Sequence, residues 1–268
     1  KKAIHVFNRD TDYEQAYCEE HTKYRLFKQP SGLSKQAENR RFLRDNYYEN
    51  LAAGKDPNYI KVYIHGEYGF VQDGKPVYPE YADHIHCQEI KALPAATLYV
   101  GLDFGLTPAA VFTQLSPSGQ YLAVDELCAT DMGAERFAEN LKSFINRHYA
   151  DYTIEYFGDP AGNQKAQTDE KTCFQIFSAK GIYIAPGEQD LMMRTEAVRK
   201  PLNTMVNGKP GLVVSPRCRM LRKGFQGEYK FRRLQVSQEK YTDQPEKNMY
   251  SHPHDALQYV ATRLFGNR

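Results

Sequence analysis

The stretch Thr97-Leu98-Tyr99-Val100-Gly101-Leu102-Asp103-Phe104 opens the most regular part of this sequence of 268 residues. Its aliphatic, aromatic and β-branched side chains predict a strand, and the runs Ala109–Leu115 and Tyr121–Cys128 predict two more. Ser116-Pro117-Ser118-Gly119, between the last two runs, is typical of a tight turn. We therefore expect three successive antiparallel strands.

Helices and strands alternate in the residues that follow. Apolar residues from Phe137 to Tyr149 recur every three or four positions, which predicts a helix capped by Thr130 or Asp131. The further expected elements are a strand Tyr152–Gly158, a helix Asp169–Lys180, a strand Ile182–Ala185, a long helix from Glu188 bent at Pro201, a strand Gly211–Ser215, basic helical turns over 216–224, a ribbon Glu228–Val236 and a helix Pro253–Phe265. This order predicts a ribonuclease H-like α/β fold, a mixed sheet with helices on both faces.

The first third of the sequence is less regular. Tyr24–Lys28 and Tyr59–Gly66 predict short strands, and Ser34–Ala53 predicts a helix. The Gly-, Pro- and Tyr-rich stretch Gly66–Tyr81 predicts a hairpin or an extended linker. These elements are too few to form the core of a compact domain, so we expect two parts, residues 1–94 and 95–268.

Composition excludes several classes of protein. With 41% apolar and 25% charged residues, the chain is typical of soluble globular proteins with a core, not of disordered ones. No run of about 18 apolar residues is present, so we expect neither a membrane span, nor a signal peptide, nor a membrane partner, and we expect a cytoplasmic protein. The five cysteines include no C-x-x-C pair, which favours reduced thiols.

Positive charge is concentrated between residues 191 and 240. This stretch carries twelve Lys or Arg against three Glu, a net charge of +9, while the remaining 23 basic and 30 acidic residues give −7. The asymmetry predicts a surface that binds a polyanion, although a merely solvated face is the alternative. The candidate phosphate contacts are Arg194, Arg217, Arg219, Arg222, Lys223, Lys230, Arg232 and Arg233, together with Lys165 and Lys171 earlier in the chain.

Three carboxylates occupy notable places in the expected fold. Asp103 lies in the first strand between Gly101 and Gly105, where the backbone could approach a ligand. Asp159 ends the fourth strand, and Asp255 lies in the first turn of the last helix. Because the first and fourth strands are neighbours in this fold and the last helix packs beside them, we expect the three acids to converge.

Converging carboxylates raise one another's pKa unless a cation neutralises them. Two Mg²⁺ or Mn²⁺ ions, about 4 Å apart, would do so and would promote in-line hydrolysis of a phosphodiester. His252 and His254 flank the third acid; either could ligate the second metal or shuttle a proton, or be an exposed residue of the first helical turn. We interpret His84 and His86, which lack further ligands nearby, as surface residues.

Three motifs resemble the nuclease half of large terminase subunits, the DNA-packaging motors of tailed double-stranded DNA bacteriophages. They are Gly101-Leu102-Asp103-Phe104-Gly105, Gly158-Asp159-Pro160-Ala161-Gly162 and His252-Pro253-His254-Asp255-Ala256-Leu257-Gln258-Tyr259. The stretches Gln29–Gly32, Ala37–Asn39, Tyr47–Leu51 and His65–Gly69 resemble the end of the family's ATPase half. The resemblance spans nearly the whole chain, and it implies an ATPase remnant with a linker over 1–94 and a nuclease domain over 95–268.

This resemblance implies an endonuclease that cuts concatemeric double-stranded DNA, with Asp103, Asp159 and Asp255 as metal ligands and His252 as a candidate fourth. It also implies the terminase ATPase half, the small terminase subunit and the portal protein as partners, in the cytoplasm of an infected bacterial cell. Two departures matter. The sequence has no G-x-x-x-x-G-K-[ST] loop, so we expect no ATP hydrolysis by this chain alone. Ser251 and His252 stand where the family often has a further acid, which leaves the second metal's coordination open.

Two other functions compete with the nuclease. Residues Leu102–Thr107 also resemble the first phosphate loop of actin-like and sugar-kinase folds, although neither a second such domain nor a Gly-rich adenosine loop is found in the sequence. The basic stretch 191–240 would equally suit a non-catalytic module that grips DNA and docks to a packaging partner.

Overall fold

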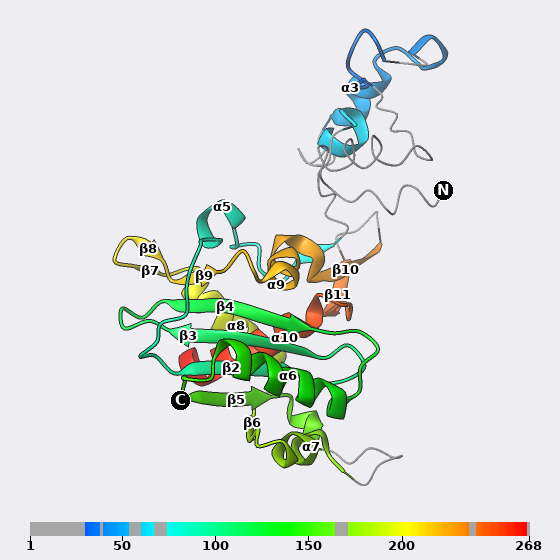
Figure 1. Cartoon of the computed structure of the whole chain (residues 1–268). Coiled ribbons are helices and arrows are strands. Elements are labelled where there is room, and N and C mark those ends of the chain that lie inside the picture. Colours follow the sequence, from blue (N-terminus) through cyan, green and yellow to red (C-terminus); the bar gives the residue numbers. More distant parts are fainter. Residues whose placement is uncertain are drawn as a thin grey trace, which may run out of the picture. The chain divides into compact units, whose positions relative to one another are not determined.

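The computed structural model describes residues 30–37, 40–53, 60–66, 74–163, 171–235 and 240–266. The chain divides into two compact units, Lys1–Asp73 and Gly74–Arg268 (Figure 1). The second unit therefore includes residues 74–94, which we grouped from the sequence with the first part.

Short helices make up the secondary structure found in the described part of the first unit. They are the 3-10 helix η1 (Arg40–Phe42), the α-helix α3 (Tyr47–Ala52) and the π-helix η2 (Ile60–Ile64). The long helix expected over Ser34–Ala53 is wrong in extent, because Asn46 has a left-handed φ of 56° and interrupts it. The strand expected over Tyr59–Gly66 is also wrong, since a short apolar run does not by itself distinguish helix from strand. The expected strand Tyr24–Lys28 lies outside the described residues.

A six-stranded mixed sheet forms the centre of the second unit. Its order is β6 (Ile184–Pro186), β5 (Ile154–Gly158), β2 (Leu98–Asp103), β3 (Ala109–Leu115), β4 (Tyr121–Cys128) and β9 (Leu212–Val214). The pairs β2–β3 and β3–β4 are antiparallel, whereas β5 is parallel to both β2 and β6, and β9 is parallel to β4. The three expected antiparallel strands and the mixed sheet are confirmed.

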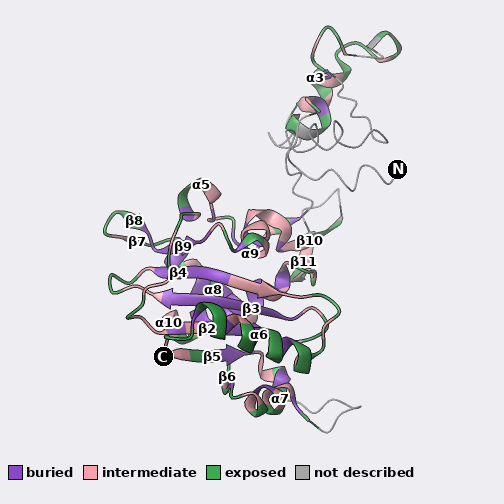
Figure 2. Ribbon diagram, in the orientation of Figure 1, coloured by how far each residue is buried: buried purple, intermediate pink, exposed green. Residues whose placement is uncertain are grey.

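Helices cover both faces of this sheet (Figures 1 and 2). On one face, α6 (Ala134–His148) and α7 (Cys173–Ala179) pack against alternate residues of β2, including Leu98, Val100 and Leu102. On the other face lie α8 (Leu191–Leu202) and α10 (Ser251–Phe265), whose buried residues form a second hydrophobic cluster with Val111 and Phe157. Side chains alternate along a strand, so the residues of β2 that alternate with Leu98, Val100 and Leu102 face the other side of the sheet, toward α10.

Smaller elements extend the second unit. They are β1 (Lys75–Pro76), α5 (Asp83–His86), η3 (Pro160–Asn163), the pair β7 (Met205–Val206) and β8 (Lys209–Pro210), α9 (Arg219–Lys223), η4 (Gly224–Glu228), β10 (Lys230–Gln235) and β11 (Lys240–Pro245). The strands β1, β10 and β11 form a separate antiparallel sheet, so the expected ribbon over 228–236 is found as β10 with a partner on each side.

Three expected helix boundaries are corrected. The residue at the N-cap of α6 is Gly133, because the helix begins only at Ala134, and Asp131, with a left-handed φ of 52°, lies in the loop before it. Pro201 lies one residue before the end of α8 instead of at a bend within a longer helix. The last helix begins at Ser251, two residues before the expected start, so Asp255 lies in its second turn.

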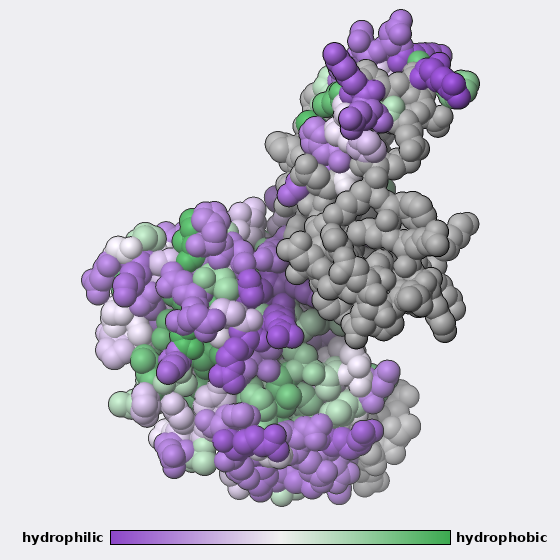
Figure 3. Space-filling model, turned by 45° about the horizontal axis from the view of Figure 1, so that its top comes forward, coloured by the Kyte–Doolittle hydropathy of each residue, from purple (hydrophilic) through white to green (hydrophobic). Residues whose placement is uncertain are grey.

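Hydrophilic residues predominate on the face of the second unit shown in Figure 3, with a hydrophobic area at its centre. Among the described residues, no helix combines the length and the apolar character that crossing a membrane requires. The four described cysteines, Cys87, Cys128, Cys173 and Cys218, are free thiols.

Candidate active site

Asp103 and Asp159 lie at the carboxyl ends of adjacent parallel strands. Leu102 of β2 is in register with Gly158 of β5, and the amide of Asp159, directly after β5, donates to the carbonyl of Leu102 at 3.2 Å. Asp103 ends β2 and alternates with the buried Leu102, so it lies on the side of the sheet that α10 covers. The strand register therefore makes these two acids neighbours.

Gly101 lets α10 approach β2 closely. A Cβ atom at this position would lie 1.9 Å from the carbonyl oxygen of Ala256, so only a residue without a side chain fits there. We expected Gly101 to let a ligand approach the backbone, but it is the backbone of α10 that packs against this glycine. This packing brings the first turns of α10 to the strand end, where Nδ1 of His252 lies 2.6 Å from Oδ2 of Asp103.

Asp103 is a buried residue, with only 5% of its surface exposed. Burial raises the pKa of Asp103 above its usual value, the hydrogen bond from His252 opposes this shift, and the negative charge of Asp255 adds to it. The ionised form of Asp103 is thus incompletely compensated by its surroundings, and a bound cation would compensate it.

Asp255 is held differently. It is 2% exposed, and its two carboxylate oxygens accept from two cationic side chains: Nη1 of Arg194 at 3.1 Å and Nζ of Lys247 at 2.5 Å. Arg194, expected to contact phosphate, is buried beside Asp255 with its guanidinium over the ring of Tyr259. Lys247 lies outside the basic stretch 191–240, and only the fold places it beside the acids.

The donor atoms suit a hard divalent cation, but the geometry gathers only part of the expected set. Within the described parts of the chain, no three His, Cys, Asp or Glu side chains are grouped so that they could hold a metal ion. Asp103 and Asp159 offer carboxylate oxygens from adjacent strand ends, and His252 offers a ring nitrogen. Asp255 does not fit in the same way, since both of its oxygens are in ion pairs.

His254 does not belong to the acidic cluster. Its ring is fully buried among Tyr78, Phe225 and Tyr229, and its Nε2 lies 3.0 Å from the carbonyl oxygen of Leu221. The prediction that His86 is a surface residue is wrong, because the residue is only 5% exposed and its ring stacks on Tyr81.

The remaining basic candidates are found in two settings. Arg217 and Arg222 form ion pairs with Asp125 and Asp83, at 2.9 and 2.6 Å. Arg219, Arg232, Arg233 and Lys171 are exposed, Lys223 and Lys230 are partly buried, and Lys165 lies outside the described residues. Arg222 is thus paired and partly buried, whereas Arg217 is paired with Asp125 although its side chain remains 58% exposed.

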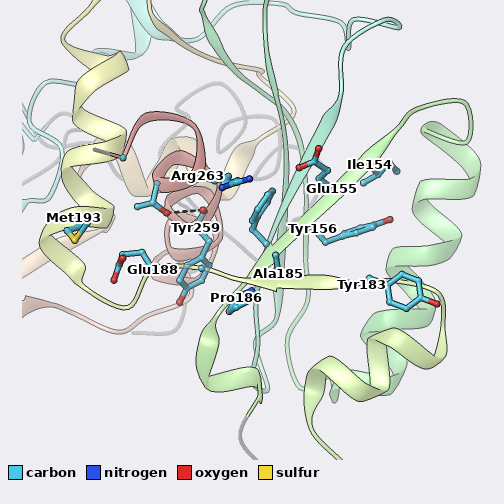
Figure 4. Close-up of a pocket in the computed structure, with 14 residues that line it drawn as sticks. Ile154, Glu155, Tyr156, Tyr183, Ala185, Pro186, Glu188, Met193, Tyr259 and Arg263 are labelled. Carbon is cyan, nitrogen blue, oxygen red and sulfur yellow. Dashed lines mark hydrogen bonds between the residues drawn. The ribbon is translucent and has the colours of Figure 1, made fainter. Parts of the chain in front are cut away.

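One groove borders the acidic cluster at Asp255, and a second cavity lies at the edge of the sheet. A groove of about 650 Å³ lies between the start of α8 and the end of β11, and Arg194, Lys247 and Asp255 are among the residues that line it. Figure 4 shows another cavity, of about 710 Å³, at the β5–β6 edge, where Glu155, Tyr183 and Tyr259 are among the lining residues. Asp255 lines the groove and none of the three acids lines the second cavity, so the groove is the better placed of these two for a substrate of the acidic cluster.

Solved structures of large terminases have a fold similar to that of this chain. The large terminase from a thermophilic bacteriophage is similar with a TM-score of 0.56 and 17% sequence identity over 84% of this chain and 53% of that chain. The P22 large terminase nuclease domain is similar with a TM-score of 0.53 and 13% identity over 74% of this chain and 96% of that chain.

This chain spans about half the length of the thermophilic phage's large terminase. No protein-family model matches the sequence, and no curated protein matches it. The similarity to the P22 domain covers nearly all of that domain. The chain therefore resembles large terminases over most of its length and has the ribonuclease H-like fold of their nuclease domains.

Proposed function

We propose that this chain is the metal-dependent endonuclease part of a viral DNA-packaging terminase, which cuts concatemeric double-stranded DNA by phosphodiester hydrolysis. The observation that carries the proposal is the position of Asp103 and Asp159 at adjacent strand ends, with α10 placing His252 against Asp103. Two Mg²⁺ or Mn²⁺ ions, when bound, would activate the attacking water and stabilise the leaving oxygen.

The side chains have distinct roles in this proposal. Asp103 and Asp159 hold a divalent cation through their carboxylates, and His252 orients Asp103 or serves as a further ligand. Arg194 fixes the carboxylate of Asp255, the third proposed ligand, from its buried position. Exposed basic residues, including Arg219 and Arg232, contact DNA phosphates without reading the base sequence.

The wider assembly follows from the same proposal. The partners would be double-stranded DNA, a terminase ATPase half, a small terminase subunit and a portal protein, in the cytoplasm of an infected bacterial cell. The structures of the thermophilic phage's large terminase and of the P22 nuclease domain support this assignment through the fold.

Replacement of the strand-end acids tests the nuclease. Asp103→Ala and Asp159→Ala should each abolish Mn²⁺-dependent nicking of a plasmid while leaving retention of DNA on a filter nearly unchanged, because the phosphate contacts lie elsewhere. Asp151→Ala, at an exposed acid before β5, is the matched control and should nick like the wild type. Full nicking by both cluster variants would remove the assignment of the active site.

A non-catalytic DNA-gripping module is the second candidate, and one observation favours it. Asp255 is already neutralised by Arg194 and Lys247, so part of the acidic cluster is stable without a metal. Such a module would retain plasmid DNA but would leave it intact at every Mg²⁺ or Mn²⁺ concentration.

A further inference from the structure

Two cations bind Asp255 from very different environments. The side chain of Arg194 is 11% exposed and comes from within α8, whereas that of Lys247 is 69% exposed and comes from the segment between β11 and α10. Both reach a carboxylate that is only 3% exposed. Arg194 is therefore fixed by the core, while Lys247 reaches Asp255 from the solvent side.

We propose that Lys247 is a displaceable internal cation, which occupies Asp255 in the metal-free protein and is released when a divalent cation takes its place. This inference rests on the proposed function, because it concerns how Asp255 becomes available as a metal ligand. It assigns to Lys247 a positioning role that the acidic motifs alone do not indicate.

The reason lies in the geometry of the carboxylate. Oδ2 of Asp255 accepts from Nζ of Lys247 at 2.5 Å, and Oδ1 accepts from Nη1 of Arg194 at 3.1 Å. A divalent ion would approach a carboxylate oxygen to about 2.1 Å, and at that site it would repel an ammonium group held on the same oxygen. The ion therefore competes with Lys247 when it takes Oδ2 and with Arg194 when it takes Oδ1.

Lys247 is the cation that can leave at little cost. Its ammonium is strongly hydrated and sits on a flexible stem that is already mostly in solvent. Arg194 is packed over the ring of Tyr259, and its Nε is buried without a hydrogen-bond partner, so the guanidinium has no comparable route to water. Lys247 also lines the groove beside Asp255. After its release from Asp255, the ammonium group would therefore still lie at this groove.

The metal binds only those molecules in which Lys247 has left Asp255. The apparent dissociation constant for the metal is therefore the intrinsic constant divided by the fraction of such molecules. Lys247→Gln removes the competing charge and should tighten Mn²⁺ binding about tenfold, within the usual range of coupled binding events. Lys247→Arg keeps a positive charge on Asp255 and should bind Mn²⁺ no more tightly than the wild type.

The test uses the full chain freed of metal by chelation. Free Mn²⁺ is measured by electron paramagnetic resonance during titration of the wild type, Lys247→Gln and Lys247→Arg, and thermal unfolding is followed with and without Mn²⁺. The glutamine variant should unfold at a lower temperature than the wild type without metal, because Asp255 loses a partner, and should gain more from Mn²⁺. Lys209→Gln is the matched control, because it removes the same charge far from the acidic cluster. Lys209 lies in β8, just before the start of β9, and β9 starts at the end of the sheet opposite Asp103.

The outcomes separate this inference from the proposed nuclease. Tighter binding by Lys247→Gln alone supports the displacement of Lys247. Equal Mn²⁺ affinity in the wild type and Lys247→Gln, with nicking by the wild type, overturns the role of Lys247 and leaves the nuclease standing. Absence of Mn²⁺ binding in all variants overturns both.

Discussion

His254 has a buried ring with one satisfied nitrogen. Nε2 lies 3.0 Å from the carbonyl oxygen of Leu221, and Nδ1 is buried without a hydrogen-bond partner. Gly224 leaves room for the ring, since a Cβ there would lie 2.2 Å from Nε2. The surroundings, which include Tyr78 and Tyr229, therefore suit a neutral imidazole and oppose a charged one.

This environment predicts a loss of stability in mild acid. Burial lowers the pKa of His254 from 6.5 to about 3, although the hydrogen bond to Leu221 opposes the shift. Below pH 6.5 His254 binds a proton in the unfolded chain but stays neutral in the folded chain. The free energy of unfolding therefore falls as pH falls towards 3. The free energy of unfolding should drop by up to about 1.4 kcal/mol per pH unit from this group, measured by urea denaturation at pH 6.5 and 5.5.

The control for that measurement is His254→Gln, which keeps a donor for the Leu221 carbonyl and does not titrate. Its stability should change less between the two pH values than that of the wild type. An identical pH dependence in both proteins would show that another group, and not His254, causes the loss.

At the scale of single residues, position along a strand could be predicted but partners could not. The sequence places Asp103 and Asp159 at strand ends, because the runs of strand-forming residues stop there. The partners of Asp255 come from Arg194, 61 positions earlier, and from Lys247, which is not part of any recognisable motif. Such pairings depend on tertiary packing, which hydrophobic periodicity does not encode.

At the scale of elements, periodicity predicted most of the second unit. The strands β3 and β4 match the expected ranges, and the apolar stripe of α6 faces the sheet as expected. The errors fall where backbone conformation overrides composition, as at Asp131 before α6 and at Asn46 before α3, both with positive φ. The role of Gly101 was also missed, because the contact it permits involves the backbone of another element.

Gly101 provides a prediction about how α10 is seated. Gly101→Ala would place a methyl group 1.9 Å from the backbone oxygen of Ala256, which cannot move without shifting the helix. We expect a loss of about 3 kcal/mol in the free energy of unfolding. Because α10 carries His252 and Asp255, Mn²⁺-dependent nicking should fall even at temperatures where the variant remains folded.

Gly133→Ala is the matched control, since it adds the same methyl group at the start of α6, where no atom lies within 4 Å. Denaturant unfolding of the two variants should separate them clearly. If Gly101→Ala were as stable and as active as Gly133→Ala, close packing of α10 on β2 would not be what assembles the site.

At the scale of the whole molecule, folding neutralises part of the charge asymmetry seen in the sequence. Four arginines of the basic stretch form ion pairs with acids from distant parts of the chain: Arg194 with Asp255, Arg199 with Glu80, Arg217 with Asp125, and Arg222 with Asp83. A count along the sequence therefore overstates the positive surface. The exposed arginines Arg219 and Arg232, which have no ion pair with another described residue, are better placed for phosphate.

This division predicts different effects on DNA binding. Arg232→Gln should weaken binding and lower the slope of the logarithm of affinity against the logarithm of salt concentration by about 1, because one phosphate contact is lost. Arg222→Gln should destabilise the fold and change the slope little, since its Nε and Nη2 already bind Asp83 at 3.0 and 2.6 Å. Filter binding of a DNA duplex between about 50 and 200 mM salt measures both slopes. Equal slope changes in the two variants would mean that Arg222 leaves Asp83 and contacts a DNA phosphate. An internal ion pair would then not exclude an arginine from the DNA-binding surface.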